Sequence, residues 1–274
     1  MSVPHNPIQE RIGHFVTKLM MRKAVRRTAF GRRTYARMYL VGKMFAERRE
    51  RIFFRRHLRA GMTVVDMGAN VGYYTVQFSK LVGASGSVYA FEPDPLCRDI
   101  LRHRVGSLAS RNVRIEDAAL GEAEGEATLY CSNRDRAENR TYPFEAGVPV
   151  ETETVRVSTL DAYCDTHAVG PIDAIKIDVE GAEVSVLRGM RGIMASNPPG
   201  WMFIEFCPIQ LAAAGDTAEE FWKTLDGDAY DCYSLDDAGE ARKIDDTAAF
   251  TARHAASFTN IFAVHRTRPQ PACA

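Results

Sequence analysis

Short apolar runs in this sequence end beside glycine and acidic residues, an arrangement that could bind a nucleoside. The first run, MTVVDM (62–67), contains Asp66 and is followed by Gly68, Ala69, Asn70, Gly72 and Tyr73. Glycines let the backbone turn tightly and approach a ligand without a Cβ in the way. The second run, SVYAF (87–91), leads into Glu92 and Pro93, where an acid can accept hydrogen bonds from both hydroxyls of a ribose. After a third run, Asp117 and Ala118 are placed to meet an adenine ring.

The form of the first turn indicates which nucleoside is bound. A dinucleotide site would have the pattern G-x-G-x-x-G, with a pyrophosphate at a helix N-terminus. Here the turn reads D-x-G-A-N-x-G and begins with Asp66. A carboxylate repels a pyrophosphate but attracts the ammonium group of a methionine. The pattern therefore favours S-adenosyl-L-methionine over NAD; the alternative is that Asp66 only caps the turn.

Three further acids predict the catalytic end of the site. Asp178 and Glu180 follow the apolar run IDAIKI (172–177), and Glu205 lies at the end of WMFIEF (201–206). A carboxylate there could act as the general base that removes the proton of an attacking hydroxyl. The alternative for Glu180 is a helix N-terminus, where acids are favoured in any case. A divalent ion is the less favoured occupant, and we predict no metal site.

Alternating strands and helices must position these residues. The predicted strands cover 62–67, 87–91, 113–118, 172–177, 201–206, 230–235 and 260–264, with helices over 71–81, 94–108, 182–194 and 218–225. This alternation predicts an α/β domain with a doubly wound, seven-stranded, mostly parallel sheet. Two more β segments, 127–131 and 153–157, flank a polar loop over 132–149. Such a long loop is either a lid with substrate contacts or a solvated insertion.

At these residues the chain resembles the FkbM-type methyltransferases. The resemblance is carried by VVDMGANVGYYTVQFS (64–79), VYAFEPDP (88–95), VSTLDAYC (157–164), IDAIKIDVEGAEVSVLRGM (172–190) and TNIFAVHR (259–266). It implies a class I, Rossmann-like enzyme that uses S-adenosyl-L-methionine, in a family associated with O-methylation of sugar and natural-product hydroxyls. It also implies that Asp66, Gly68, Asn70 and Gly72 surround the methionine, that Glu92 binds the ribose and that Asp117 lies near the adenine. Class I enzymes often have a third glycine where this chain has Asn70. The resemblance gives no equally firm base.

Charge is unevenly distributed along a chain of zero net charge. Residues 1–60 contain 16 basic and three acidic side chains, a net charge of +13, and residues 61–274 carry −13. We therefore expect a basic helical extension (1–60), a catalytic domain (61–268) and a short tail (269–274). A globally basic nucleic-acid binder is excluded. There is no long apolar run, no secretory signal and no C-x-x-C pair, which favours the cytoplasm.

Three interpretations of the extension stay open: a cover packed on the domain, a basic amphipathic segment (residues 8–30) that contacts the inner face of a membrane, or an arm that contacts nucleic acid. The predicted function is O-methylation of a small-molecule hydroxyl on a sugar, lipid-linked sugar, glycoconjugate or natural product. The rivals are a nucleic-acid methyltransferase, an NAD-dependent oxidoreductase and a non-catalytic membrane-associated scaffold. The oligomeric state is left open, with a homodimer as one option.

Overall fold

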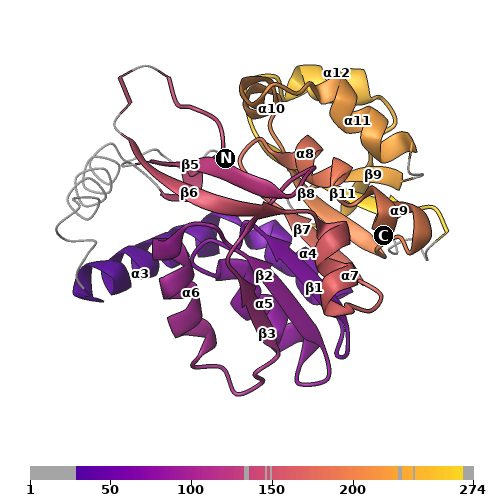
Figure 1. Ribbon diagram of the computed structural model, residues 1–274. Helices are drawn as coiled ribbons and strands as arrows, with labels where there is room; N and C mark the ends of the chain where they lie inside the picture. The colour runs from indigo at the N-terminus through magenta and orange to yellow at the C-terminus, as the bar shows by residue number, and fades with distance from the viewer. Residues whose placement is uncertain are drawn as a thin grey trace.

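A central eight-stranded sheet organises the computed structural model, which describes residues 29–132, 136–145, 147–148, 150–227, 230–236 and 238–267. The strand order is β10-β9-β11-β8-β7-β1-β2-β3, with helices packed against the sheet (Figure 1). The strands are β1 (Thr63–Met67), β2 (Ser87–Phe91), β3 (Val113–Glu116), β7 (Ala174–Ile177), β8 (Trp201–Phe206), β9 (Tyr230–Leu235), β10 (Ala241–Lys243) and β11 (Thr259–His265). The predicted α/β class is confirmed.

The number of strands differs from the prediction of seven. All seven predicted strands are present, and β10 adds an eighth at the edge of the sheet, paired antiparallel with β9. Its three residues, Ala-Arg-Lys, are too few to produce a pattern of alternating apolar and polar positions. The eighth strand therefore left no signal in the sequence.

Four parallel strands end together at one edge of the sheet. Met67 of β1 aligns with Phe91 of β2 and with Ile177 of β7, and Ile177 aligns with Ile204 of β8. The segments that follow these four residues therefore meet at the same edge. This is the position at which open α/β sheets bind ligands.

The helices are α3 (Ala29–Ala46), α4 (Arg48–His57), α5 (Tyr73–Val82), α6 (Pro95–Val105), α7 (Leu160–His167), α8 (Glu183–Arg188), α9 (Arg191–Ser196), α10 (Pro208–Ala214), α11 (Ala218–Gly227) and α12 (Thr247–Arg253). The single helix predicted over 182–194 is wrong, because it is broken between α8 and α9. A Cβ on Gly189 would lie 1.9 Å from the carbonyl oxygen of Gly121, so the chain passes here with no room for a side chain. None of the described helices is long and apolar enough to cross a membrane.

The two β segments that interrupt the alternation form a second, smaller sheet. Strands β4 (Ala119–Leu120), β6 (Val150–Ser158) and β5 (Gly125–Ser132) pair in the order β4-β6-β5. In Figure 1, β5 and β6 are long arrows that run across the direction of β1–β3. The loop between them includes the short 3₁₀ helix η1 (Arg136–Glu138). Because β4 follows β3 directly, this sheet is held beside the edge where the parallel strands end.

The described part of the N-terminal extension shares a core with the sheet. Phe53 and Phe54 of α4 are 0% and 1% exposed. The Phe53 ring centroid lies 4.4 Å from that of Phe262 on β11 and 5.6 Å from that of Trp201 on β8. The expected boundary at residue 60 thus separates a basic from an acidic part of the sequence, and residues from both parts pack into one hydrophobic core. Nearly all of segment 8–30 and the whole tail 269–274 lie outside the described residues.

Candidate active site

A cavity opens at the edge where β1, β2, β7 and β8 end. Its empty volume, with the open solvent at its mouth included, is about 930 Å³. Ten of the thirteen predicted site residues line it: Gly68, Ala69, Asn70, Tyr73, Glu92, Pro93, Ala118, Asp178, Glu180 and Glu205. The other three, Asp66, Gly72 and Asp117, do not line it. The strand ends therefore gather most of the predicted residues at one place.

The turn after β1 requires the residue types found there. Gly68 has φ +75°, and a Cβ on it would lie 1.8 Å from the carbonyl oxygen of Asp178. Asn70 has φ +50°, a left-handed conformation that asparagine adopts more readily than most residues. This explains why asparagine can stand where related enzymes often have a glycine. Gly72, at φ +78°, precedes α5 and packs against Leu101 rather than the cavity.

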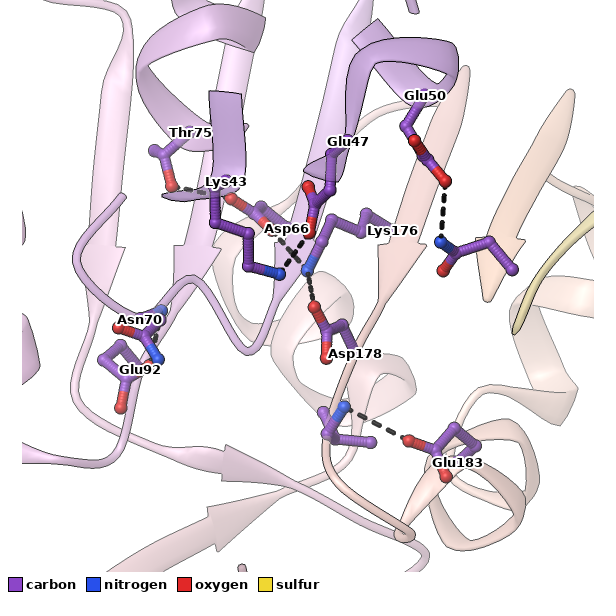
Figure 2. A network of polar contacts seen from close by, with 12 residues as sticks. Lys43, Glu47, Glu50, Asp66, Asn70, Thr75, Glu92, Lys176, Asp178 and Glu183 are labelled. Carbon is purple, nitrogen blue, oxygen red and sulfur yellow. Dashed lines mark hydrogen bonds and ion pairs between the residues drawn. The ribbon is translucent and has the colours of Figure 1, made fainter. Parts of the chain in front are cut away.

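Glu92 is held rigidly at the cavity wall. Its carboxylate accepts hydrogen bonds from the backbone N–H of Asn70 at 2.6 Å (Figure 2) and of Asp94 at 2.8 Å. Burial and the neighbouring Asp94 raise the pKa of Glu92 to about 8, although the two backbone hydrogen bonds act to lower it. Each carboxylate oxygen has two acceptor positions, so each retains one for a hydroxyl of a bound ribose.

Asp66 belongs to a buried ionic network beneath the cavity. Its carboxylate accepts a hydrogen bond from Thr75 Oγ1 at 2.6 Å and lies 3.6 Å from Lys176 Nζ. Lys176 also pairs with Asp178 at 3.1 Å (Figure 2). The Asp66 side chain is 0% exposed, pairs with Lys176 and does not line the cavity. Its expected place beside the ammonium group of a methionine stays a prediction.

Asp178, Glu180 and Glu205 form a carboxylate cluster at the other end of the cavity. One oxygen from each side chain lies within 4.8 Å of the others, as expected from their positions after β7 and at the end of β8. Glu180 accepts a hydrogen bond from Gln210 Nε2 at 2.6 Å and has φ +54°, a strained conformation for glutamate. The spacing could accommodate a cation. Because Lys176 already pairs with Asp178 at this position, we assign no metal to the cluster.

The members of the carboxylate cluster differ in their acidity. Burial acts to raise the pKa of Asp178, but the charges of Lys176 and Lys43 outweigh it and leave this pKa below its ordinary value. Burial and then the charge of Asp178 raise the pKa values of Glu180 and Glu205 well above the ordinary range. The cluster therefore combines one carboxylate that stays ionised with two that retain protons more strongly. This is the pattern of environments from which acid and base roles arise.

Comparison with known proteins identifies the family. Residues 66–232 match the methyltransferase FkbM domain. This chain belongs to the FkbM methyltransferase family. Methyltransferase 1 of Beauveria bassiana is 29% identical over 174 residues, covering 57% of this chain and 67% of that protein. 2-O-methyltransferase NoeI of Sinorhizobium fredii is 26% identical over 144 residues, covering 46% of this chain and 56% of that protein. A structure of an S-adenosylmethionine-dependent O-methyltransferase from Thermotoga maritima is 15% identical, with a TM-score of 0.42 and coverage of 85% of this chain and 73% of that one.

As an FkbM methyltransferase, the protein uses S-adenosyl-L-methionine as its methyl donor, as predicted. The residues of the cavity fit this cofactor. Glu92 offers two acceptor positions for the ribose, and the turn after β1 brings backbone close to the cavity without side chains in the way. Ala118, which is 1% exposed and lies between β3 and β4, also lines the cavity, and its contact with the adenine stays a prediction.

Asp117, predicted near the adenine, does not line the cavity. Its side chain is 60% exposed and pairs with the guanidinium group of Arg98 at 2.7 Å. Arg98 is fixed by donating hydrogen bonds to the carbonyl oxygens of Glu92 and Pro93, each at 2.9 Å. The Asp117 carboxylate therefore pairs with Arg98 outside the cavity, and its contact with the adenine stays a prediction.

Tyr39 and Lys43, which reach the cavity from α3, were missed in the sequence. Asn139 and Arg140 reach it from the loop between β5 and β6, for which substrate contact was one of the two interpretations. Of the two interpretations of that loop, contact with the site is the one the structure supports. Lys176 also lines the cavity, and a lysine inside the apolar run IDAIKI was a signal that could have been used. Lys43 left no signal, because its role depends on how α3 packs.

Proposed function

We propose that this FkbM methyltransferase transfers the methyl group to a hydroxyl oxygen of a small molecule, with a sugar, glycoconjugate or related natural product as the acceptor. The observation that carries the proposal is the pair Glu180 and Glu205, two carboxylates with raised pKa values at the cavity wall. The name of the relative 2-O-methyltransferase NoeI supports oxygen as the methylated atom.

A hydroxyl group has to lose its proton as its oxygen attacks a methyl group. S-adenosyl-L-methionine supplies an electrophilic methyl when bound, so the protein has to align the acceptor and remove that proton. In its ionised form, a carboxylate with a raised pKa is a stronger base than an ordinary one. Glu180 and Glu205 meet this condition, whereas Asp178 is stabilised as an anion by Lys176. We therefore assign the base to Glu180 or Glu205, and to Asp178 the task of holding Lys176.

The acceptor end of the cavity suits a polyhydroxylated molecule. The carboxylate cluster can accept hydrogen bonds from several hydroxyl groups, and Tyr39, Tyr73 and Tyr74 line the same cavity with aromatic rings and hydroxyl groups. Few precisely oriented polar groups among apolar walls are typical of small-molecule sites. These features support a sugar-like acceptor over a long polymer.

Binding of the product S-adenosylhomocysteine tests the cofactor end. Glu92→Gln should weaken this binding by roughly tenfold or more at pH 9, where Glu92, with its pKa of about 8, is ionised, because a charge-assisted hydrogen bond contributes about 1.5–3 kcal/mol. The matched control is Glu126→Gln, whose side chain is exposed on β5 away from the cavity. Calorimetry that gives equal affinities for the two variants would remove Glu92 from the cofactor site.

Turnover tests the acceptor end. Incubation with methyl-labelled S-adenosyl-L-methionine and separate pools of sugars, glycolipids and RNA should place the label on a sugar hydroxyl. Glu180→Gln or Glu205→Gln should then lower kcat by about 10²–10⁴ while S-adenosylhomocysteine still binds. Label in RNA alone would contradict the proposed acceptor class, and unchanged kcat in both variants would contradict the base.

A further inference from the structure

Arg140 presents a fixed guanidinium group to the cavity. It lies in the loop between β5 and β6, and its backbone exchanges hydrogen bonds with Tyr130 at 2.8 and 3.2 Å. The centre of its guanidinium group is 4.5 Å from the ring centroid of Tyr142 and 3.8 Å from that of Phe144. The two backbone hydrogen bonds hold the residue in place and the two cation–π contacts restrict its side chain, so little freedom remains to be lost when a ligand binds.

The three cations that line the cavity differ in their partners. Lys43 pairs with Glu47, and Lys176 pairs with Asp66 and Asp178. Within the part of the chain that the structure describes, no carboxylate pairs with Arg140, and its Nε is buried without a hydrogen-bond partner. A buried donor left unpaired destabilises the folded protein, and a bound acceptor group would remove that cost.

We propose that Arg140 binds an anionic group, a carboxylate or a phosphate, of a molecule in the cavity. The planar guanidinium group matches the two oxygens of such an anion. In a cavity that also holds the carboxylate cluster, an anion needs a cation that is not already paired with a protein carboxylate, and Arg140 meets this condition among the described residues. Two sources have this chemistry: the carboxylate of the cofactor's methionine part, and an acidic acceptor such as a uronic acid or a sugar phosphate. The second source rests on the proposed function, whereas the first does not.

Binding experiments on the full chain separate the two sources. S-adenosylhomocysteine and S-adenosyl-3-thiopropylamine, which lacks only the carboxylate, are titrated into wild type and Arg140→Met. D-glucuronate and inorganic phosphate are then titrated into the same proteins saturated with S-adenosylhomocysteine. A loss of about tenfold for S-adenosylhomocysteine but not for its decarboxylated analogue assigns the cofactor carboxylate. A similar loss for glucuronate or phosphate assigns an acidic acceptor.

The control is Arg253→Met, an exposed residue of α12 that does not line the cavity. Arg140→Lys keeps the charge but not the planar fork, and we expect it to lose at least about threefold in the same titration. It also carries the test if Arg140→Met does not fold. Affinities within twofold of wild type for all four ligands in both Arg140 variants would overturn the inference. These titrations measure binding and not methyl transfer. If the proposed O-methylation fails, they still show whether Arg140 binds the carboxylate of the cofactor.

Discussion

Replacing Lys176 with methionine should destabilise the fold strongly. Lys176 Nζ lies 3.1 Å from Asp178 and 3.6 Å from Asp66, and the side chains of Lys176 and Asp66 are 3% and 0% exposed. Methionine keeps most of the length and apolar volume, so the substitution removes mainly the charge. Removal of one partner from a buried ion pair costs roughly 3–5 kcal/mol. In a domain of this size that cost corresponds to a fall in Tm of roughly 6–20 °C.

The destabilisation by Lys176→Met should increase with pH. Without the lysine, Asp66 has to be buried as an uncompensated anion or take up a proton. Its ordinary pKa is 3.8, so protonation costs about 2 kcal/mol at pH 5.5 and about 6 kcal/mol at pH 8. Burial already raises the pKa of Asp66 in the wild type, and loss of the opposing Lys176 charge raises it further, so the variant loses additional stability as pH rises above the unfolded pKa. The cost should therefore grow by about 1.4 kcal/mol per pH unit until it reaches the 3–5 kcal/mol limit.

Urea unfolding followed by tryptophan fluorescence at pH 5.5 and 7.5 measures this effect. Lys80→Met is the matched control, because Lys80 is exposed on α5. The double variant Asp66→Asn with Lys176→Met should recover part of the loss, since it removes one buried anion. A cost below about 1 kcal/mol at pH 7.5, or the same cost at both pH values, would refute the reasoning.

Three further predictions concern single residues. Gly68→Ala should lower the free energy of unfolding in urea by more than about 3 kcal/mol, because the new Cβ would lie 1.8 Å from the carbonyl oxygen of Asp178. Gly215→Ala, at φ +96° with no neighbour within 4 Å, should lower it by only about 1–2 kcal/mol through backbone strain. Equal losses in the two variants would exclude the clash. Burial raises the pKa of Glu183 to about 7, above its unfolded value, so the wild type loses stability as pH rises to 7. The free energy of unfolding of Glu183→Gln should therefore rise by about 2–3 kcal/mol relative to that of the wild type between pH 5 and 8. The same pH dependence in both proteins would contradict this. Lys43→Met removes a charge that lowers the pKa values of all three carboxylates of the cluster, so the acid limb of the kcat/KM–pH profile should move to higher pH. Lys43→Arg should restore the wild-type profile. An acid limb at the wild-type pH in Lys43→Met would show that Lys43 is only structural.

The sheet and the strand-end residues could be predicted because they depend on local patterns. The strands Ser87–Phe91, Trp201–Phe206 and Tyr230–Leu235 have the predicted limits, since each is a short run rich in apolar residues that ends at polar or turn residues. The parallel register then brings the residues after β1, β2, β7 and β8 to one edge. Glu92 and the carboxylate cluster were found for this reason alone.

What could not be predicted depends on contacts between distant segments. The sequence gives no indication that Arg98 would pair with Asp117, because 19 residues and a strand separate the two. Asp66 has the predicted place at the end of β1, but its side chain turns toward Lys176, which only the pairing of β1 with β7 reveals. A pattern along one chain locates a residue at an edge of the sheet, whereas the partner of its charge depends on the neighbouring strand.

The basic extension and the acidic domain are joined through the active site. Of the three interpretations of the extension, packing on the domain accounts for residues 29–60: Phe53 is buried against β8 and β11, and Lys43 lines the cavity near Asp178. Figure 2 shows Lys43 and Lys176 on the same side of Asp178, one from α3 and one from β7. The matched family segment, 66–232, contains the three carboxylates and only the second of these lysines. The charge balance of the cluster therefore depends on a helix outside that segment, and loss of α3 should alter the acidity of the cluster even where the cofactor still binds.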